Sequence, residues 1–353
     1  MMSSTRRPTV TIAIPTFNEE QHIEGVIKRF QGSGYPDIIE ILVADGMSTD
    51  ETRSIVQKMA QKDPRIQLID NPERVQSAGL NKLISLAKGD LFLRADAHCD
   101  YSDDYVQKSV ETVQKTGALN AGGPQRFVAS NRFQAFVALA VENVFGSGGA
   151  KYRDKAYYGF ADTVFLGCYQ TPVLKELGGF LTNNVTNEDA ELNIRLQKEQ
   201  DDAVYINPDI KVWYYPRRDF LSLFKQYFRY GKGRSLTVFR HSASKSGRGI
   251  TPFLVIFLLI AVFLVLLLTG NGYYLSYIIG GLLVVLALSV LATVIRTRKS
   301  FEPEIWRGEK EDMPRIAARF FGVLVVVVTM NVAHFAGFGW QLIKVLVTGK
   351  RSW

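Results

Sequence analysis

Charged residues are missing from two long stretches of this 353-residue chain. No Asp, Glu, Lys or Arg occurs from Gly249 to Ile295, and none occurs from Phe320 to Ile343. A helix needs about 20 apolar residues to cross the hydrocarbon core of a bilayer, so these stretches exclude a wholly soluble protein. The chain before Gly249 has the composition of an ordinary soluble domain.

Cysteine is scarce as well, because Cys99 and Cys168 are the only two in the chain and lie far apart. Their spacing excludes a disulfide framework and the common zinc-ligand patterns, and it indicates reduced thiols in a cytosolic domain. Arg6 and Arg7 are not followed by an apolar stretch, so we expect no signal peptide there. The first domain is therefore expected to stay on the cytoplasmic side.

Acidic residues are nearly absent from one segment that precedes the first apolar stretch. The chain has a net charge of +8, and residues 211–248 hold ten Lys or Arg against one acid, Asp219. A basic segment beside a membrane-spanning stretch favours an anionic membrane surface over nucleic acid. It also suits a substrate that carries phosphates.

Short apolar runs alternate with helical patterns before residue 120. The runs predict strands at 10–16, 38–45, 66–70 and 90–96, with helices at 20–31, 48–62, 77–88 and 103–116 between and after them; the second helix opens at a capping box, Ser48–Glu51. Residues 120–190 are irregular and glycine-rich, Asn187-Glu188-Asp189 opens another helix, and 204–215 indicates an edge strand or strand pair.

This alternation predicts an α/β fold, in which a mostly parallel sheet carries helices on both faces. Ligands of such sheets bind beyond the carboxyl ends of the strands. The polar groups of interest therefore follow each strand, in residues 16–20, 45–50, 70–74 and 96–100.

Three apolar segments are predicted to span the membrane, at 252–269, 273–295 and 320–346. The loop 296–319 holds seven Lys or Arg and, like 211–248, is expected on the cytoplasmic side. The third span would then place its basic end, Gly349-Lys350-Arg351-Ser352-Trp353, on the outer side of the membrane. This placement is contrary to the rule that basic residues stay on the cytoplasmic side.

The amphipathic helix at 219–231 is expected to lie in the membrane interface, although a packed surface helix shows the same pattern. The chain thus divides into a cytoplasmic domain (1–215), a basic interfacial segment (216–250) and a membrane domain (251–353).

Several polar groups suit a transferase that uses a nucleotide sugar. Such an enzyme needs charge to stabilise a departing diphosphate and a carboxylate that takes the proton of the acceptor hydroxyl. Asp45 and Asp50 could bind a nucleobase or a ribose, but such residues also occur in turns and helix caps. Asp96 and His98 could bind Mg²⁺ or Mn²⁺, but they also suit a solvated turn. Glu188 and Asp189, taken alone, are explained by their position at a helix N-terminus, where the helix dipole favours carboxylates.

In order, these groups make a recognisable series of motifs: Pro15-Thr16-Phe17-Asn18-Glu19-Glu20, Ala44-Asp45-Gly46-Met47-Ser48-Thr49-Asp50, Arg94-Ala95-Asp96-Ala97-His98, Asn187-Glu188-Asp189 with Arg195, and Gln226-Tyr227-Phe228-Arg229-Tyr230. Over about residues 8–240 the chain resembles glycosyltransferase family 2. In detail it looks most like membrane-anchored exopolysaccharide glucosyltransferases of the succinoglycan type.

The resemblance implies a Rossmann-like GT-A fold, inverting chemistry and a metal-bound nucleotide sugar. The resemblance assigns binding of the nucleobase to Asp45, binding of the metal to Asp96, and abstraction of the acceptor's proton to Asp189. The remaining nucleotide-sugar residues that we predict are Pro15, Thr16, Asn18, Glu20, Asp50 and Arg74, with Glu188, Gln226, Arg229 and Tyr230 near the diphosphate and acceptor.

Two departures from the family pattern change the expected site. Arg94 stands where the first aspartate of the family's DxD element is usual, and His98 follows Asp96 by two residues, so His98 is a candidate second metal ligand. Tyr230 replaces a tryptophan that looks typical of processive synthases. This exchange, with only three predicted spans, favours single sugar additions.

The sequence therefore predicts transfer from a nucleotide sugar, a UDP-sugar by the resemblance, to a polyprenyl- or other lipid-linked acceptor. The divalent metal would be Mn²⁺ or Mg²⁺. The enzyme is expected to be a multi-pass protein of the inner (plasma) membrane with a cytoplasmic catalytic domain and no nucleic-acid partner. The alternatives are a processive polysaccharide synthase, a catalytically silent scaffold of an assembly complex and, lower, a nucleotidyltransferase.

Overall fold

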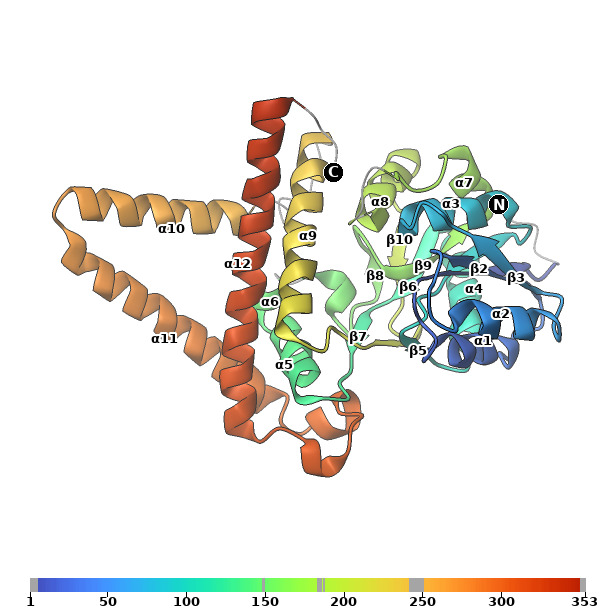
Figure 1. Ribbon diagram of the computed structural model, residues 1–353, viewed down its shortest axis with the longest axis horizontal. Coiled ribbons are helices and arrows are strands. Elements are labelled where there is room, and N and C mark those ends of the chain that lie inside the picture. Colours follow the sequence, from blue (N-terminus) through green and yellow to red (C-terminus); the bar gives the residue numbers. More distant parts are fainter. Residues whose placement is uncertain (1–5, 148–149, 183–185, 187, 241–250, 350–353) are drawn as a thin grey trace. The chain divides into compact units, whose positions relative to one another are not determined.

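The computed structural model describes residues 6–147, 150–182, 186, 188–240 and 251–349 (Figure 1). The chain forms two compact units, one of residues 1–126 with 151–214 and the other of 127–150 with 215–353. From the sequence we predicted a boundary after residue 215. The sequence did not indicate that 127–150 joins the second unit.

The first unit is built on an eight-stranded sheet with the order β3-β2-β1-β4-β9-β6-β10-β8. The strands are β1 (Val10–Thr16), β2 (Ile38–Asp45), β3 (Ile66–Asp70), β4 (Leu91–Arg94), β6 (Asn120–Gly123), β8 (Gly159–Phe160), β9 (Phe165–Gln170) and β10 (Val204–Ile206). The β1–β2, β1–β4, β2–β3 and β6–β10 pairs are parallel. Strand β9 runs antiparallel between β4 and β6. Because the four pairs above are parallel, the sheet is mostly parallel, as predicted.

A second, three-stranded sheet has the order β5-β11-β7. It comprises β5 (Cys99–Tyr101), β7 (Gln125–Phe127) and β11 (Val212–Tyr214). The helices of the first unit are α1 (Ile23–Gln31), α2 (Thr52–Ala60), α3 (Gln76–Leu86), α4 (Tyr105–Thr116), α7 (Thr171–Glu176) and α8 (Glu188–Glu199), with a 3₁₀ turn at Lys151–Arg153.

Local sequence explains several of these elements. Helix α1 buries Ile23, Val26, Ile27 and Phe30, a spacing that places one apolar face against the sheet. Helix α4 ends at Gly117, which adopts a left-handed backbone with φ 70°, as helix C-termini often require. The predicted strands 10–16, 38–45 and 66–70 are confirmed, whereas β4 stops at Arg94 and leaves Asp96 in the turn that follows.

The capping box predicted at Ser48–Glu51 is wrong in its details. Helix α2 begins at Thr52 after the N-cap residue Glu51, which makes no side-chain cap hydrogen bond, and the Thr52 N–H donates to Asp50 Oδ1 at 3.0 Å. The Ser48 hydroxyl instead donates to Asp45 Oδ1 at 2.5 Å. A buried carboxylate close in sequence therefore competes for the serine that local pattern assigned to the helix.

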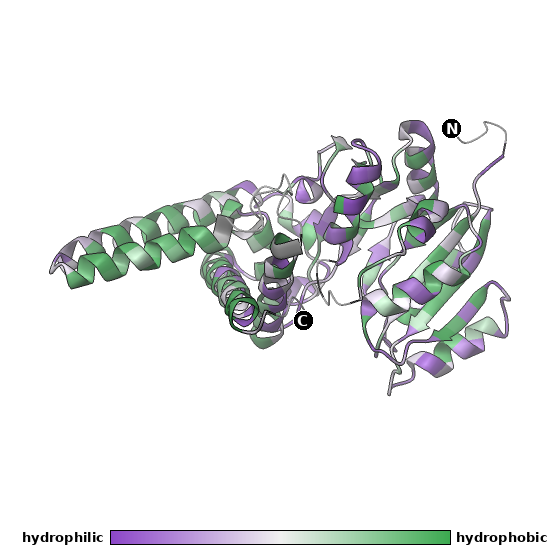
Figure 2. Cartoon of the chain, turned by 90° about the horizontal axis from the view of Figure 1, so that it is seen from above, coloured by the Kyte–Doolittle hydropathy of each residue, from purple (hydrophilic) through white to green (hydrophobic). Residues whose placement is uncertain are grey.

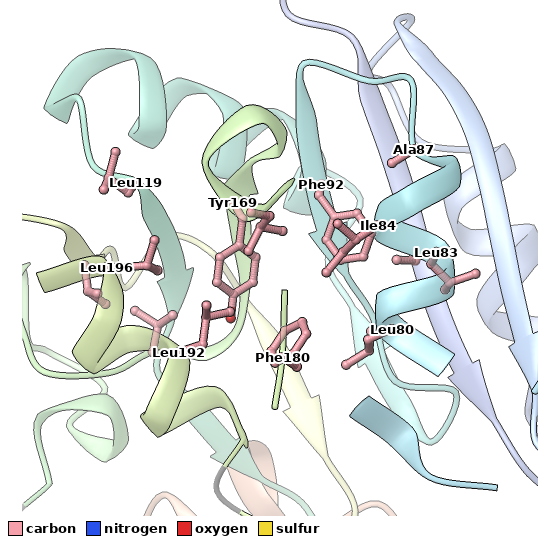
Figure 3. Packing of buried hydrophobic residues seen from close by; sticks show 14 of the residues in the cluster. Leu80, Leu83, Ile84, Ala87, Phe92, Leu119, Tyr169, Phe180, Leu192 and Leu196 are labelled. Atoms are coloured by element: carbon pink, nitrogen blue, oxygen red, sulfur yellow. The ribbon is translucent and has the colours of Figure 1, made fainter. Parts of the chain in front are cut away.

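The hydrophobic core of the first unit holds α8 against the sheet (Figure 3). Leu192 and Leu196 of α8 lie in one buried cluster with Tyr169 of β9 and Phe180. Arg195 adds polar anchors, because its guanidinium donates to the Leu177 and Gly179 carbonyls at 2.8 and 2.7 Å. The start of α8, with Glu188 and Asp189, is therefore positioned by both core packing and hydrogen bonds.

The second unit is helical. It contains α5 (Arg132–Val141), α6 (Val144–Ser147), α9 (Phe220–Arg240), α10 (Thr251–Leu268), α11 (Gly272–Arg296) and α12 (Ile316–Thr348), with short helical turns at Phe301–Ile305 and Lys310–Asp312. Two of them, α11 and α12, are long and apolar enough to cross a membrane, and α10 is a shorter apolar helix. The predicted helix 219–231 is present and continues to Arg240.

Candidate active site

The strand order places a candidate site at the carboxyl ends of β1 and β4. The chain runs from β1 outward to β2 and β3 and then returns to pair β4 with the other edge of β1. Ligands of open α/β sheets bind at such a reversal of strand order. The turns after β1 and β4 carry residues 16–20 and 96–98, two of the groups that the sequence singled out.

Unusual backbone conformations gather at this edge. Asn18, Met47 and Arg74 have φ values of 53°, 63° and 54°, and they follow β1, β2 and β3 respectively. Left-handed backbone is uncommon for residues other than glycine and is often found at functional sites. Two of the predicted nucleotide-sugar residues, Asn18 and Arg74, are therefore held in strained turns at the expected edge.

The turns after β1 and β2 are joined by hydrogen bonds. Ser48 Oγ accepts from the Asn18 N–H at 2.8 Å, and Asn18 Oδ1 accepts from the Thr49 N–H at 2.9 Å. Glu20 contributes further, because its Oε2 accepts from the Glu51 N–H at 3.0 Å and its own N–H donates to Asp50 Oδ2 at 3.2 Å. Asn18, Glu20 and Asp50 thus shape one loop pair.

Pro15 and Thr16 end β1, paired with Ala44 and Asp45 of β2. The Thr16 hydroxyl is buried and has no hydrogen-bond partner among the described residues. A buried polar group without a partner needs an explanation, and a bound donor molecule would supply one. The role of Pro15 and Thr16 in binding the donor stays a prediction.

Asp45 is more enclosed than its assigned role suggests. Its side chain is 0% exposed, and its two carboxylate oxygens accept from the Ser48 hydroxyl, the Ser48 N–H and Arg53 Nη1, the last at 2.7 Å. Arg53 also donates to Asp70 Oδ1 at 2.8 Å. Direct contact between Asp45 and a base would require one of these donors to move, and that contact stays a prediction.

The turn after β4 presents Asp96 and His98. The Tyr101 hydroxyl lies 2.7 Å from the Asp96 backbone nitrogen and 3.0 Å from its carbonyl oxygen, which fixes this turn. His98 Nδ1 lies 3.1 Å from Glu19 Oε1, and its ring packs edge-on against Tyr214. Histidines that bind metals commonly pair their second nitrogen with a carboxylate. Glu19 was not assigned a role from the sequence, although it lies inside the first motif.

Arg94 joins the two carboxylate-bearing elements of the site. Its buried guanidinium lies 3.5 Å from Asp96 Oδ1 through Nε and 3.3 Å from Glu188 Oε1 through Nη1. A buried cation beside carboxylates offsets part of their charge. The residue that departs from the family pattern therefore links the turn after β4 to the start of α8.

Glu188 and Asp189 differ in surroundings although they are adjacent. Burial raises the pKa of Glu188 to about 7, Arg94 opposes this rise, and the Asp189 charge adds to it. The Asp189 side chain is half-buried, and its Oδ1 accepts from the Ala190 N–H at 2.7 Å. Asp189 is therefore the more accessible of the two carboxylates, which suits contact with an acceptor.

A divalent metal fits this site only with help from its substrate. Among the described residues no group of three or more His, Cys, Asp and Glu could hold a metal by itself. Metals of this kind are often bound by one or two protein ligands together with substrate phosphates. Asp96 supplies a carboxylate, and His98, whose Nδ1 lies 3.1 Å from Glu19 Oε1, is the candidate second ligand.

Gln226, Arg229 and Tyr230 lie on α9 in the second unit. Gln226 Nε2 donates to the Tyr230 hydroxyl at 2.9 Å, one helical turn away. The two residues therefore form one polar group on α9. The approach of these residues to the diphosphate and acceptor stays a prediction.

The raised pKa of Glu188 predicts a pH dependence of stability. The folded protein holds this proton more tightly than the unfolded chain, where the value is near 4.5. The contribution of Glu188 to stability is therefore complete below about 4.5 and is lost as the pH rises through about 7. The melting temperature of the wild type should fall between pH 5 and 7.5, and we expect Glu188→Gln to make this fall smaller. Unfolding is measured by tryptophan fluorescence in detergent.

Glu199→Gln, at an exposed position on the same helix, is the matched control and should leave the slope unchanged. An equal slope in wild type and Glu188→Gln would show that Glu188 ionises normally.

Comparisons with known proteins identify the family. The family model described as glycosyl transferase family 2 matches residues 11–169. The chain is 36% identical over 246 residues to the succinoglycan biosynthesis protein ExoA of Rhizobium meliloti (strain 1021), covering 69% of this chain and 74% of that protein.

A more distant relative comes from Methanococcus voltae. The chain is 31% identical over 238 residues, 65% of its length and 74% of the relative, to its dolichyl N-acetyl-alpha-D-glucosaminyl phosphate 3-beta-D-2,3-diacetamido-2,3-dideoxy-beta-D-glucuronosyltransferase.

A similar solved structure is the mannosyltransferase PcManGT from Pyrobaculum calidifontis in complex with GDP-Man and Mn²⁺. It has a TM-score of 0.56 and 18% identity, and the match covers 96% of this chain and 88% of that one. This likeness supports the predicted GT-A-like fold. The sequence identity to ExoA and the match of the family model show that the chain belongs to glycosyltransferase family 2.

Proposed function

We propose that this protein is an inverting, metal-dependent glycosyltransferase that moves one sugar from a nucleotide sugar to a lipid-linked acceptor. The reaction takes place at the cytoplasmic face of the plasma membrane, in the biosynthesis of a polysaccharide or glycolipid. The donor is a UDP-sugar by family resemblance, and a GDP-sugar is the alternative. The names of the two relatives, one from succinoglycan biosynthesis and one acting on a dolichyl phosphate sugar, support this assignment.

One observation carries the proposal. Arg94 connects Asp96, at the donor end of the sheet, with Glu188, the neighbour of Asp189 at the start of α8. A donor-side carboxylate and the neighbour of the candidate base therefore belong to one buried network within one unit. A single displacement needs these two functions on opposite sides of the reacting carbon.

The chemistry follows from these positions. Asp189 takes the proton of the acceptor hydroxyl while that oxygen bonds to the anomeric carbon of the sugar. The bond between this carbon and the diphosphate oxygen breaks, and the configuration at the carbon inverts. A divalent metal on Asp96 and His98 would supply positive charge that stabilises the leaving nucleoside diphosphate. Arg94 keeps Asp96 and Glu188 in place.

The test is transfer by the purified full-length protein in nanodiscs. A panel of UDP- and GDP-sugars is offered with a polyprenyl-diphosphate-sugar acceptor, and both nucleoside diphosphate release and lipid product are measured. We expect one preferred donor and a product longer by one sugar. Long products would indicate a processive synthase instead, and no release with any donor would indicate a silent scaffold.

The Glu19–His98 pair predicts a specific effect on metal use. Glu19→Gln keeps the shape of the side chain but removes the carboxylate that faces His98 Nδ1. Loss of such a partner commonly weakens metal affinity about 10- to 100-fold. We therefore expect Glu19→Gln, and His98→Ala more strongly, to raise the Mn²⁺ concentration needed for half-maximal activity.

The control is Glu24→Gln, which changes an exposed carboxylate on α1 that pairs with Lys28. If all three variants have the Mn²⁺ titration curve of the wild type, His98 is not a ligand.

A further inference from the structure

The hairpin of α10 and α11 exposes apolar side chains on every side. Along α10 the exposed residues follow one another around the whole helix: Leu254, Val255, Phe257, Leu258, Leu259, Ile260, Val262, Phe263, Leu264, Val265, Leu267 and Leu268. Helix α11 does the same from Tyr273 to Leu288, and Figure 2 shows apolar colour along both helices. A helix that is apolar all round needs an apolar environment all round, which a bilayer supplies.

The dimensions of this hairpin fit a bilayer crossing. With 18 and 25 residues, α10 and α11 are about 27 and 37 Å long, against a hydrocarbon core of about 30 Å. The connection between them is uncharged, and Tyr273, Tyr274 and Tyr277 are exposed next to it. Tyrosines gather at the membrane–water interface, so this tip fits the far surface.

Helix α12 differs, because only one stripe of it is exposed. The stripe contains Phe321, Val325, Val328, Val332, Ile343 and Leu346, whereas Val323, Met330, Gly337 and Gln341 on the opposite side are buried. Spacings of three and four place each set on one helix face. One face of α12 is thus covered by protein, and the other is apolar and uncovered.

A basic helix lies against the middle of α12. A side chain at Gly231 of α9 would collide with the backbone of His334 and Phe338, and one at Gly337 of α12 would collide with the backbone of Phe228. The two helices therefore touch through their backbones near the centre of the charge-free stretch 320–343. The cations Arg229, Lys232 and Arg234 of α9 follow or flank this contact.

Two shorter helices, α5 and α6, also contact α12. Asn331 Nδ2 donates to the Phe145 carbonyl of α6 at 2.9 Å, and a side chain at Gly322 would collide with the Phe136 ring of α5. The turn at Glu142–Asn143 connects α5 and α6. Charged side chains are costly in the hydrocarbon region. A transmembrane α12 would carry the cations of α9 into the bilayer.

The hairpin of α10 and α11 extends away from α12 on the side that carries the exposed stripe. Phe253 of α10 stacks on Phe335 and Phe338, with ring centroids 5.0 and 4.6 Å apart. Figure 1 shows α9 and the hairpin on opposite sides of α12. The apolar stripe and the hairpin therefore face one medium, and the basic helix faces the other.

We propose that α10 and α11 cross the bilayer as a hairpin, whereas α12 lies along the cytoplasmic surface with its exposed stripe among the acyl chains. The partner of this stripe is the lipid bilayer. Both ends of α12 then stay in the cytoplasm, and Lys344, Lys350 and Arg351 obey the positive-inside rule that a third span would break. The proposal is independent of the sugar chemistry.

The first test is labelling of single introduced cysteines with a membrane-impermeant maleimide, in intact cells and in inverted vesicles. Thr348→Cys should react only in inverted vesicles, as Glu311→Cys does in the basic loop, and Asn271→Cys at the tip only in intact cells. Cys99 and Cys168 are buried, and the parent protein provides the blank. Reaction of Thr348→Cys from outside, or of Asn271→Cys from inside, overturns the proposal.

The second test measures depth with nitroxide labels at Val325, Val332 and Ile343 in nanodiscs, from accessibility to oxygen and to a polar nickel reagent. An in-plane α12 gives three similar, shallow depths. A spanning α12 spreads these positions over about 27 Å, with Val332 deepest. Low accessibility to both reagents at all three positions would mean that a second copy of the chain covers the stripe, and that result also rejects the proposal.

Discussion

Replacing Asp189 with asparagine should lower kcat by about 100- to 10,000-fold, the usual contribution of a general base. Asparagine keeps the size of the side chain and an oxygen that accepts from the Ala190 N–H, as Asp189 Oδ1 does at 2.7 Å. The start of α8 should therefore keep its structure. The amide cannot take the proton of an acceptor hydroxyl, so the loss should fall on the chemical step.

The measurement is single-sugar transfer by purified Asp189→Asn, with donor binding followed separately by calorimetry. Donor affinity should stay within a few-fold of the wild type. Asp201→Asn changes an exposed aspartate of the same unit and should leave both quantities unchanged. Turnover by Asp189→Asn near the wild-type rate would falsify the assignment of Asp189 as the base.

Replacing Arg94 with methionine should destabilise the first unit by about 3–5 kcal/mol, the usual effect of removing one partner from a buried ion pair. Methionine fills most of the volume of Arg94, so the loss comes from charge. Glu188 and Asp96 would keep their buried positions without the guanidinium that lies 3.3 and 3.5 Å away. At 2–4 °C per kcal/mol the melting temperature should fall by roughly 6–20 °C.

A second change in the same protein separates charge from packing. Glu188→Gln removes the carboxyl group that faces Arg94, so the double variant Arg94→Met/Glu188→Gln should recover part of the lost stability. Lys198→Met, an exposed cation of α8, should have little effect. If the double variant is as unstable as the sum of the two single variants, Arg94 and Glu188 do not interact energetically.

Local pattern was enough to predict the frame of the first unit. Strands 10–16 and 38–45 are mostly apolar runs, because parallel strands inside a sheet are buried on both faces, and the structure has these two and the edge strand 66–70 at the predicted residues. The site residues of that unit followed from the same logic, since strand ends fix where Thr16, Asp45 and Asp96 lie.

Long-range contacts were beyond that reasoning. Strand β9 pairs with β4 and β6, and nothing local in a glycine-rich segment indicates that it completes the sheet. The links from Arg94 to Glu188 and from His98 to Glu19 join residues 94 and 79 positions apart. Only folding brings these pairs together, so the sequence showed Arg94 as a departure without showing what it holds.

The backbone contact of α9 with α12 has a mechanical consequence. At Gly231 and Gly337 the backbones of the two helices are in direct contact, so we expect the pair to move as one rigid body. In the proposed placement this helix pair lies on the membrane surface, and Gln226 and Arg229 stay at a constant height relative to the lipid phosphates. The enzyme then searches for its lipid acceptor in two dimensions, because the third coordinate is already set.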